Sequence, residues 1–236
     1  VEDARVGQAT DYDRLILAQG GSPIRPALPG ADSAHVFTLW TVPDVDRMQA
    51  FLLREQPRHA VVVGGGFIGL EMAEAFRARG LDTTLVELQP TVMSQMDPEF
   101  GAQIAGECEL HAVTVCTSTG LVAIHADART VELTDGRRIP ADLVLLSIGV
   151  RPELTLAAQA GLAMGTSGGL LVNEHLQSSD PNIYAAGDMI EVEHRVSGRR
   201  VRIAVAAPAN RQGRIAASNA LGGAMTYQGA LGKSVV

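Results

Sequence analysis

The chain has 236 residues and a formal net charge of −7, and 46% of its residues are hydrophobic whereas 4% are aromatic. This composition argues against a nucleic-acid interface, because phosphates repel negative charge and bases need aromatic rings on which to stack. Apolar runs fall short of the roughly 18 residues that a membrane span requires, so we expect neither a nucleic-acid nor a membrane partner.

The segment before residue 55 predicts a strand, a loop and a helix. The apolar run after Tyr12, within residues 11–18, indicates a buried strand that stops at Gly20. Residues 22–30 contain three prolines, which indicates a loop. Residues 41–54 carry apolar side chains at helical spacing behind a proline and an aspartate, as helix starts often do.

A βαβ unit follows. Residues 60–63 form a short apolar strand, and the glycine-rich turn 64–69 comes directly after it. Residues 70–79 combine helix formers with apolar residues, and the glycine that follows is typical of a helix end. Residues 83–87 indicate a second strand that ends in an acid. This order of elements predicts an α/β fold with parallel strands.

The pattern then changes from helical to strand-like. Asp97 and Pro98 predict the start of a helix that runs to about Leu110. Asp135-Gly136 is a strong hairpin turn. We expect a small antiparallel meander and a long return strand, with strands near 112–116, 120–126, 129–134 and 141–148.

The last part of the chain alternates strands and turns before a final helix. Strands are expected near 170–172, 183–186 and 199–204, and a helix from Pro208 to about Leu221. Four arginines between residues 195 and 202 form a small basic cluster. Because Glu191 and Glu193 are interleaved with it, we interpret this region as a solvated hairpin.

The motif Gly64-x-Gly66-x-x-Gly69 predicts a dinucleotide site. The first glycine permits the tight turn, the second lets a pyrophosphate approach the backbone, and the third lets helix and strand pack closely. The pyrophosphate would then lie at the positive end of the helix. The strand before the motif and the helix after it strengthen this interpretation, and the alternative is a glycine-rich turn without a ligand.

Glu87 stands at the end of the second strand, 18 residues after Gly69. At that position a carboxylate can accept hydrogen bonds from the adenosine ribose and repels a 2′-phosphate. Since no arginine follows in Leu88-Gln89-Pro90, the sequence favours NADH over NADPH. The alternative is a solvated acid at a strand end.

Two further strands end in glycine, at Gly20 and at Gly187, where a ligand can approach the backbone closely. Asp188 follows the second of these glycines and could bind a sugar or ribitol hydroxyl, or it could cap a turn. The six histidines are scattered and the two cysteines, Cys108 and Cys116, fit no redox or zinc spacing, so we predict no metal. Two reduced thiols indicate a cytoplasmic protein.

Taken together, these motifs resemble the pyridine nucleotide-disulfide oxidoreductases over essentially the whole chain. The resemblance rests on the segments Leu15–Gly20, Val61–Glu71, Ile148–Pro152 and Ile183–Asp188. The later segments Ala207–Arg214, Tyr227–Gly229 and Gly232–Val235 are most similar to the coenzyme A-disulfide reductase and NADH oxidase/peroxidase branch.

The resemblance implies a Rossmann-like NAD-binding domain, residues 43–157, inserted in part of an FAD-binding domain, residues 1–42 and 158–236. It implies NAD contacts by the three motif glycines and Glu87 together with Phe67, Ile68, Glu71 and Gly149, and FAD contacts by Gly20, Gly187, Asp188, Ala206 and Ala207. In the family, Phe67 and Glu71 lie where nicotinamide meets flavin. The helix start near Ala206 would stabilise a reduced, anionic flavin.

The resemblance also implies that this chain is an internal piece of a longer enzyme. The first FAD-binding motif and the redox-active cysteine are expected upstream of residue 1, and a dimerisation domain beyond residue 236. We expect the piece to be inactive alone and its parent to be a homodimer. The parent would pass hydride from NADH to FAD and on to a disulfide, persulfide, peroxide or oxygen. The alternatives are a ferredoxin- or rubredoxin-type reductase, and a non-catalytic NAD-binding module that senses redox state.

Overall fold

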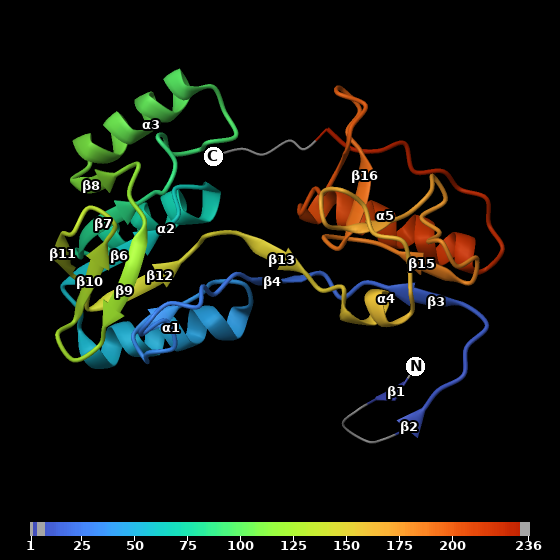
Figure 1. Ribbon diagram of the computed structural model, residues 1–236, viewed down its shortest axis with the longest axis horizontal. Coiled ribbons are helices and arrows are strands. Elements are labelled where there is room, and N and C mark those ends of the chain that lie inside the picture. The colour runs from blue at the N-terminus through green and yellow to red at the C-terminus, as the bar shows by residue number, and fades with distance from the viewer. Residues whose placement is uncertain (1, 4–7, 232–236) are drawn as a thin grey trace. The chain divides into compact units, whose positions relative to one another are not determined.

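The computed structural model describes residues 2–3 and 8–231 (Figure 1). The motif Gly232–Val235 lies outside the described residues. The helices are α1 (Val42–Glu55), α2 (Phe67–Ala78), α3 (Pro98–Leu110), α4 (Thr155–Gln159) and α5 (Ala206–Ala220). In the described part of the chain no helix is long and apolar enough to cross a membrane.

The strands are short and fall into several small sheets. In chain order they are β1 (Glu2–Asp3), β2 (Gln8–Ala9), β3 (Leu15–Leu17), β4 (Gly21–Pro23), β5 (Val36–Phe37), β6 (His59–Val63), β7 (Asp82–Val86), β8 (Val113–Cys116), β9 (Leu121–His125), β10 (Thr130–Leu133), β11 (Arg138–Pro140), β12 (Leu143–Leu146), β13 (Val150–Pro152), β14 (Leu170–Leu171), β15 (Ile183–Ala185), β16 (Ile190–Glu193) and β17 (Arg200–Val201).

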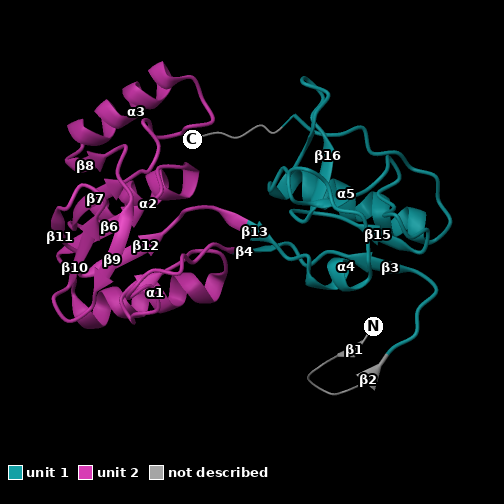
Figure 2. Cartoon of the chain, in the orientation of Figure 1, with its two compact units in different colours: residues 1–22, 151–235 teal, residues 23–150, 236 magenta. Residues whose placement is uncertain are grey.

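The chain divides into two compact units (Figure 2). The first combines the described residues up to Ser22 with those from Arg151 onward, and the second is Pro23–Val150. These limits differ from the expected domain boundaries at 42/43 and 157/158. Residues 23–42 belong to the second unit because β5 pairs with β12 in its sheet and the Ile124 amide donates to the Pro29 carbonyl.

The second unit is built on a parallel sheet whose described strands have the order β5-β12-β6-β7-β8. Alternate residues of each strand face opposite sides. Ala60 and Val62 contribute to a core with α1, α2 and α3, whereas Val61 and Val63 contribute to a second core with β9 and β10. The result is three layers, with the helices on one face of the sheet and the antiparallel meander β9-β10-β11 on the other.

The α/β fold class is therefore confirmed, and two details differ from expectation. Residues 113–116 are not part of the meander, because β8 pairs in parallel with β7 at the edge of the main sheet. The hairpin at Asp135-Gly136 joins β10 to β11 as predicted. Residues 22–23, expected in a loop, belong to β4, which pairs with β13.

The first unit contains one apolar core around the parallel pair β3 and β15. Leu17, Tyr184 and Ala185 from these strands are buried with Ile215 and Ala216 of α5. Strands β14, β16 and β17 form a separate small sheet in the same unit. Ile16 in β3 is 38% exposed, so this strand is less buried than its sequence suggested.

Candidate functional site

The glycine turn between β6 and α2 has the close contacts that its sequence predicts. Gly64 has a φ of +108°, and a Cβ on it would lie 2.4 Å from the carbonyl oxygen of Ser147. A Cβ on Gly69 would lie 1.8 Å from the carbonyl oxygen of Gly64. Both distances are far below van der Waals contact, so these positions accept only glycine.

Gly66 differs from its two neighbours in the motif. A Cβ on Gly66 would meet no described atom within 4 Å, and its φ of −85° suits any residue. Neither packing nor backbone conformation therefore requires a glycine at position 66. This open space at the N-cap of α2 agrees with a turn that a ligand approaches closely.

The start of α2 is open to an anion. Gly66 is the N-cap residue, the first turn carries no acid, and no side chain in the described residues caps it. Free N–H groups and the helix dipole together favour negative charge at such an end. A pyrophosphate fits both this charge and the open space at Gly66.

Glu87 follows β7 and lies beside the same turn. Its Oε2 accepts a hydrogen bond from the Gly65 amide at 2.6 Å, and its Oε1 accepts one from the Gln89 amide at 2.7 Å. The carboxylate is only partly buried. The structure thus brings together the glycine turn and the acid that the sequence paired by spacing alone.

Ser147 supports the turn from the neighbouring strand and was not identified from the sequence. Its Oγ donates to the carbonyl oxygens of Val63 at 2.9 Å and Gly64 at 3.1 Å. Its amide also donates to the Val63 carbonyl. Ser147 is separated from Val63 by 84 positions and from Gly64 by 83 positions, so no local sequence pattern could have revealed these contacts.

The other expected NAD residues lie around this turn with different exposure. Phe67 begins α2, is half-buried and packs against the apolar core, whereas Ile68 is 39% exposed. Glu71 is exposed one turn further along α2. Gly149 lies three residues after β12, has a φ of +104°, and accepts a hydrogen bond from the Ile24 amide. Their roles toward a nicotinamide stay predictions.

The first unit has its own group of expected site residues. Gly20 and Gly187 follow β3 and β15, which are parallel neighbours, so both glycines lie at the carboxyl ends of the strands. Ligands of α/β sheets bind outside such ends. Gly20 has a φ of +68° and Gly187 a φ of +85°, which few other residues adopt.

The turn at Gly187 and Asp188 adjoins the start of α5. A Cβ on Gly187 would lie 3.9 Å from the Cβ of Ala209, in the first turn of that helix. The helix begins at Ala206, two residues before the expected start. Ala206 and Ala207 therefore belong to its first turn, and both are exposed. This helix end also lacks an acid and a side-chain cap among the described residues.

Asp188 is a partly buried carboxyl group in this turn. Burial raises the pKa of Asp188 above its ordinary value. Within the described part of the chain it accepts no hydrogen bond. A carboxyl group without a protein donor is able to accept a hydrogen bond from a ligand hydroxyl.

Gln212 anchors the same turn and was missed by sequence analysis. It is 1% exposed, its Oε1 accepts from the Gly187 amide at 2.8 Å, and its Nε2 donates to the Tyr227 hydroxyl at 3.1 Å. The turn beside Asp188 is therefore fixed by a buried side chain of α5. A glutamine in a polar stretch gives no sign of burial, which is why it was overlooked.

One expectation in this unit is wrong. The arginines near residue 200 do lie in a hairpin, β16-β17, but Glu191 is fully buried rather than solvated. Its Oε1 accepts hydrogen bonds from the amides of Ser167 and Gly169. Burial alone would raise its pKa, but these hydrogen bonds outweigh burial and hold the pKa of Glu191 below its ordinary value.

Comparison with known proteins places these features in a family. The family model described as pyridine nucleotide-disulphide oxidoreductase matches residues 1–213. An NAD(P)H sulfur oxidoreductase (CoA-dependent) of Pyrococcus abyssi is 36% identical over 227 residues, covering 95% of this chain and 51% of that protein. The chain thus spans about half the length of this curated relative.

Two further matches are a solved structure and a curated ferredoxin reductase subunit. The reduced CoADR-RHD of Bacillus anthracis has a crystal structure with a TM-score of 0.91 and 43% identity, and the match covers 99% of this chain and 42% of that one. The ferredoxin reductase subunit of a 5,5'-dehydrodivanillate O-demethylase from a Sphingobium strain is 37% identical over 227 residues, covering 94% of this chain and 54% of that protein.

Proposed function

Because the chain belongs to the pyridine nucleotide-disulphide oxidoreductase family, we propose that it supplies the NADH-binding unit and part of the FAD-binding unit of a flavoenzyme. The enzyme would pass hydride from NADH to FAD and then reduce a disulfide, a persulfide, a peroxide or oxygen. The observation that carries this proposal is the pairing of the open glycine turn with Glu87.

The second unit would hold NADH by its adenosine and pyrophosphate. The free amides at the start of α2 would bind the pyrophosphate, with the space at Gly66 admitting it to the backbone. Glu87 would exchange its internal hydrogen bond to Gly65 for the ribose hydroxyls. The same carboxylate would repel a 2′-phosphate, so we propose NADH rather than NADPH as the donor.

The first unit would hold part of FAD. Asp188 would accept a hydrogen bond from a sugar or ribitol hydroxyl, and Gly20 and Gly187 would let the cofactor approach the strand ends. The start of α5, at Ala206 and Ala207, would place positive potential beside the flavin ring. When both cofactors are bound, they supply the hydride donor and the hydride acceptor.

Phe67 and Glu71 would act where nicotinamide meets flavin. They lie one turn apart on α2, so they share a face of the helix that also carries the phosphate-binding turn. The half-buried ring of Phe67 would shield the flavin from water until nicotinamide displaces it. The exposed carboxylate of Glu71 is free to pair with a cation in a part of the enzyme outside this chain.

The final electron acceptor is proposed only from the names of the relatives. The Pyrococcus abyssi relative is named an NAD(P)H sulfur oxidoreductase (CoA-dependent), so we favour a sulfur compound, a disulfide or a persulfide, as the substrate class. We place the enzyme in the cytoplasm, since Cys108 and Cys116 are free thiols. We also propose that the whole protein forms a homodimer, as the family resemblance implies.

The test is to express the longer protein, load it with FAD and follow NADH oxidation with each acceptor. We expect turnover with NADH and a disulfide or persulfide, and little with NADPH. Lack of flavin reduction by NADH in the loaded protein would contradict the proposal.

A second candidate is an electron-transfer reductase that serves a ferredoxin. It is favoured by the 37% identity to the Sphingobium ferredoxin reductase subunit over nearly the whole chain. The two candidates share the hydride step and differ in the acceptor that reoxidises the flavin. A cysteine close to the flavin in the longer protein, whose replacement abolishes turnover, would select the disulfide or persulfide reaction.

A further inference from the structure

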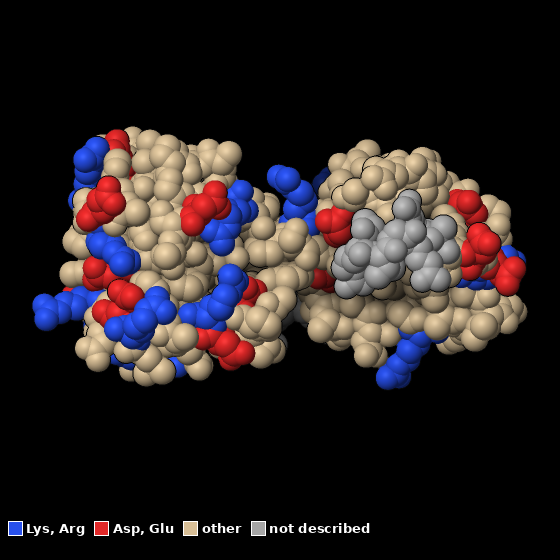
Figure 3. All heavy atoms as spheres, turned by 90° about the horizontal axis from the view of Figure 1, so that it is seen from below, with Lys and Arg blue, Asp and Glu red and all other residues tan. Residues whose placement is uncertain are grey.

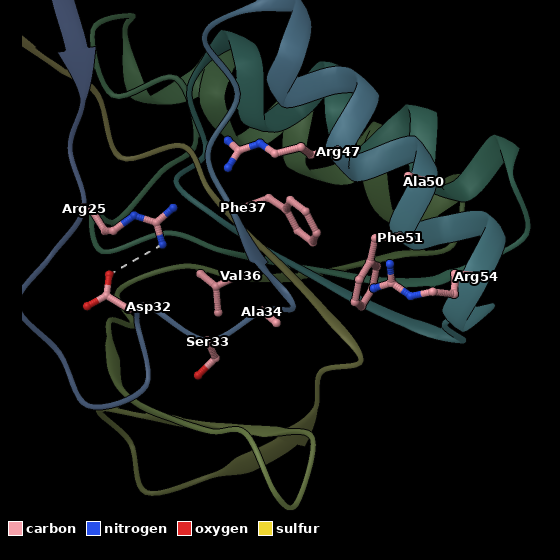
Figure 4. Close-up of a pocket in the computed structure, with 10 residues that line it drawn as sticks. All are labelled: Arg25, Asp32, Ser33, Ala34, Val36, Phe37, Arg47, Ala50, Phe51 and Arg54. Carbon is pink, nitrogen blue, oxygen red and sulfur yellow. Dashed lines mark ion pairs between the residues drawn. The ribbon is translucent and has the colours of Figure 1, made fainter.

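The second unit contains a hollow that the proposed function does not use. It measures about 520 Å³ and lies between α1 and the segment 32–37 (Figure 4). None of the residues of the glycine turn lines it. The lining consists of Arg25, Asp32, Ser33, Ala34, Val36, Phe37, Arg47, Ala50, Phe51 and Arg54.

Three arginines border this hollow, which we call the arginine hollow. Arg47 and Arg54 are seven residues apart, so they lie on one face of α1 about two turns, or roughly 10 Å, from each other. Arg25 approaches from the loop before β5. Figure 4 draws the rings of Phe37 and Phe51 between these guanidinium groups. The two rings make an edge contact, with centroids 5.2 Å apart.

Each guanidinium is held by a neighbouring group. Arg25 donates from Nη1 to the carbonyl oxygen of Ala31 at 2.6 Å, and Arg47 is paired with Asp44. Arg54 donates from Nε to Glu55 at 2.9 Å and lies 6.0 Å from the centre of the Phe51 ring. A guanidinium has five N–H donors, so each of these groups keeps donors for a ligand while its position is restrained.

The lining offers an anion guanidinium donors rather than a large net positive charge, because each of the three arginines has a carboxylate partner. The residues that line the hollow include three arginines and one aspartate, and the carboxylates Asp44 and Glu55, which pair with two of these arginines, lie outside the lining. The aspartate, Asp32, is 94% exposed and only 4.0 Å from Arg25, which makes a weak ion pair. A volume of about 520 Å³ lies within the usual range for small-molecule sites.

We propose that the arginine hollow binds a small molecule that carries a di- or triphosphate group. Arginine forks match phosphate oxygens in pairs, and several adjacent phosphates can engage guanidiniums from both sides of the hollow. A large acidic protein partner fits less well. On the face shown in Figure 3, positive and negative side chains are interspersed over this unit, so no continuous basic surface is presented.

The test follows backbone amide NMR signals of the chain during titration with inorganic tripolyphosphate and, separately, with ADP. We expect the signals of residues 32–37 and 47–54 to move in both titrations, apart from any change at residues 64–69. The double substitution Arg47→Gln and Arg54→Gln should weaken this response at least about tenfold. Arg79→Gln, which replaces the exposed arginine directly after α2, is the matched control and should leave the response unchanged.

Several results would overturn the proposal. One is an absence of shifts at residues 32–37 and 47–54 at millimolar tripolyphosphate and ADP. Another is an equal response of the double variant and the wild type. A third is a response to an acidic peptide at lower concentration than to either phosphate compound, which would assign the surface to a protein partner.

A response to tripolyphosphate but not to ADP would assign the site to inorganic polyphosphate and would support the proposal. Since residues 64–69 are followed separately, a failure of NADH binding does not affect this result.

Discussion

The Glu87 carboxylate accepts a hydrogen bond from the Gly65 amide at 2.6 Å, across the glycine turn. The acid that should recognise the ribose is therefore held beside the turn that should bind the pyrophosphate. Gly65 and Glu87, which are separated by 22 positions in the sequence, meet here because β6 and β7 are adjacent parallel strands that end at the same edge of the sheet.

Glu87→Ala should narrow the preference for NADH over NADPH by about tenfold or more, because the repulsion of the 2′-phosphate is removed. Calorimetric titration of both dinucleotides measures the ratio. Glu87→Gln, which keeps an acceptor oxygen but not the charge, separates the hydrogen bond from the repulsion. An unchanged ratio in both variants would exclude Glu87 as the selecting residue.

Gly66→Ala should weaken NADH binding and leave the free energy of unfolding within about 0.5 kcal/mol of wild type. The reason is that the added methyl group meets no described atom but enters the space that we propose for the pyrophosphate. Thermal unfolding and calorimetry measure the two effects. Gly106→Ala in α3, which also meets no described atom, is the control and should leave NADH binding unchanged.

Gly69→Ala should behave differently from Gly66→Ala. Its methyl group would lie 1.8 Å from the Gly64 carbonyl oxygen, so the turn must open. We expect a loss of at least about 2 kcal/mol in the free energy of unfolding, measured with denaturant. A stable Gly69→Ala protein with normal NADH affinity would show that the turn tolerates a side chain at this position.

Gln212→Leu should destabilise the first unit by about 1–3 kcal/mol, because it leaves the Gly187 amide without its buried acceptor. Tyr227→Phe removes one hydrogen bond to Gln212 and should cost less, about 1 kcal/mol. Denaturant unfolding, followed by a probe in the first unit, measures both. Equal effects of the two substitutions would mean that the Gly187 contact adds nothing.

The sequence predicted the glycine turn between a strand and a helix and the position of Glu87 after the next strand, because the motif is local, whereas the roles of these residues toward a dinucleotide stay predictions. It placed the start of α2 three residues late, since the Gly66 N-cap carries no capping side chain to mark it. Ser147 and Gln212 were missed because their partners are distant in the sequence. Glu191 was misjudged because hydropathy treats every glutamate as solvated, whereas two loop amides bind this one.

Asp188→Asn should stabilise the unliganded chain at neutral pH. Burial raises the pKa of Asp188 in the folded state, so the folded state binds more protons than the unfolded state between the two pKa values. Stability is then lost as pH rises from the ordinary pKa of an unfolded aspartate through the raised folded pKa, and the cost of Asp188 is full above it. Unfolding of both proteins between pH 3.5 and about 8 should show the advantage of the asparagine variant disappear at the acid end. A pH-independent difference would contradict this account.

The most direct test of the central claim is a calorimetric titration of the chain itself with NADH and with NADPH. We expect one NADH site per chain, and NADPH binding that is weaker by about tenfold or more. NMR signals of residues 64–69 and 87 should move on NADH addition. Equal or tighter binding of NADPH would contradict the selective role of Glu87, and no binding of NADH with unmoved signals at the glycine turn would contradict the proposed function.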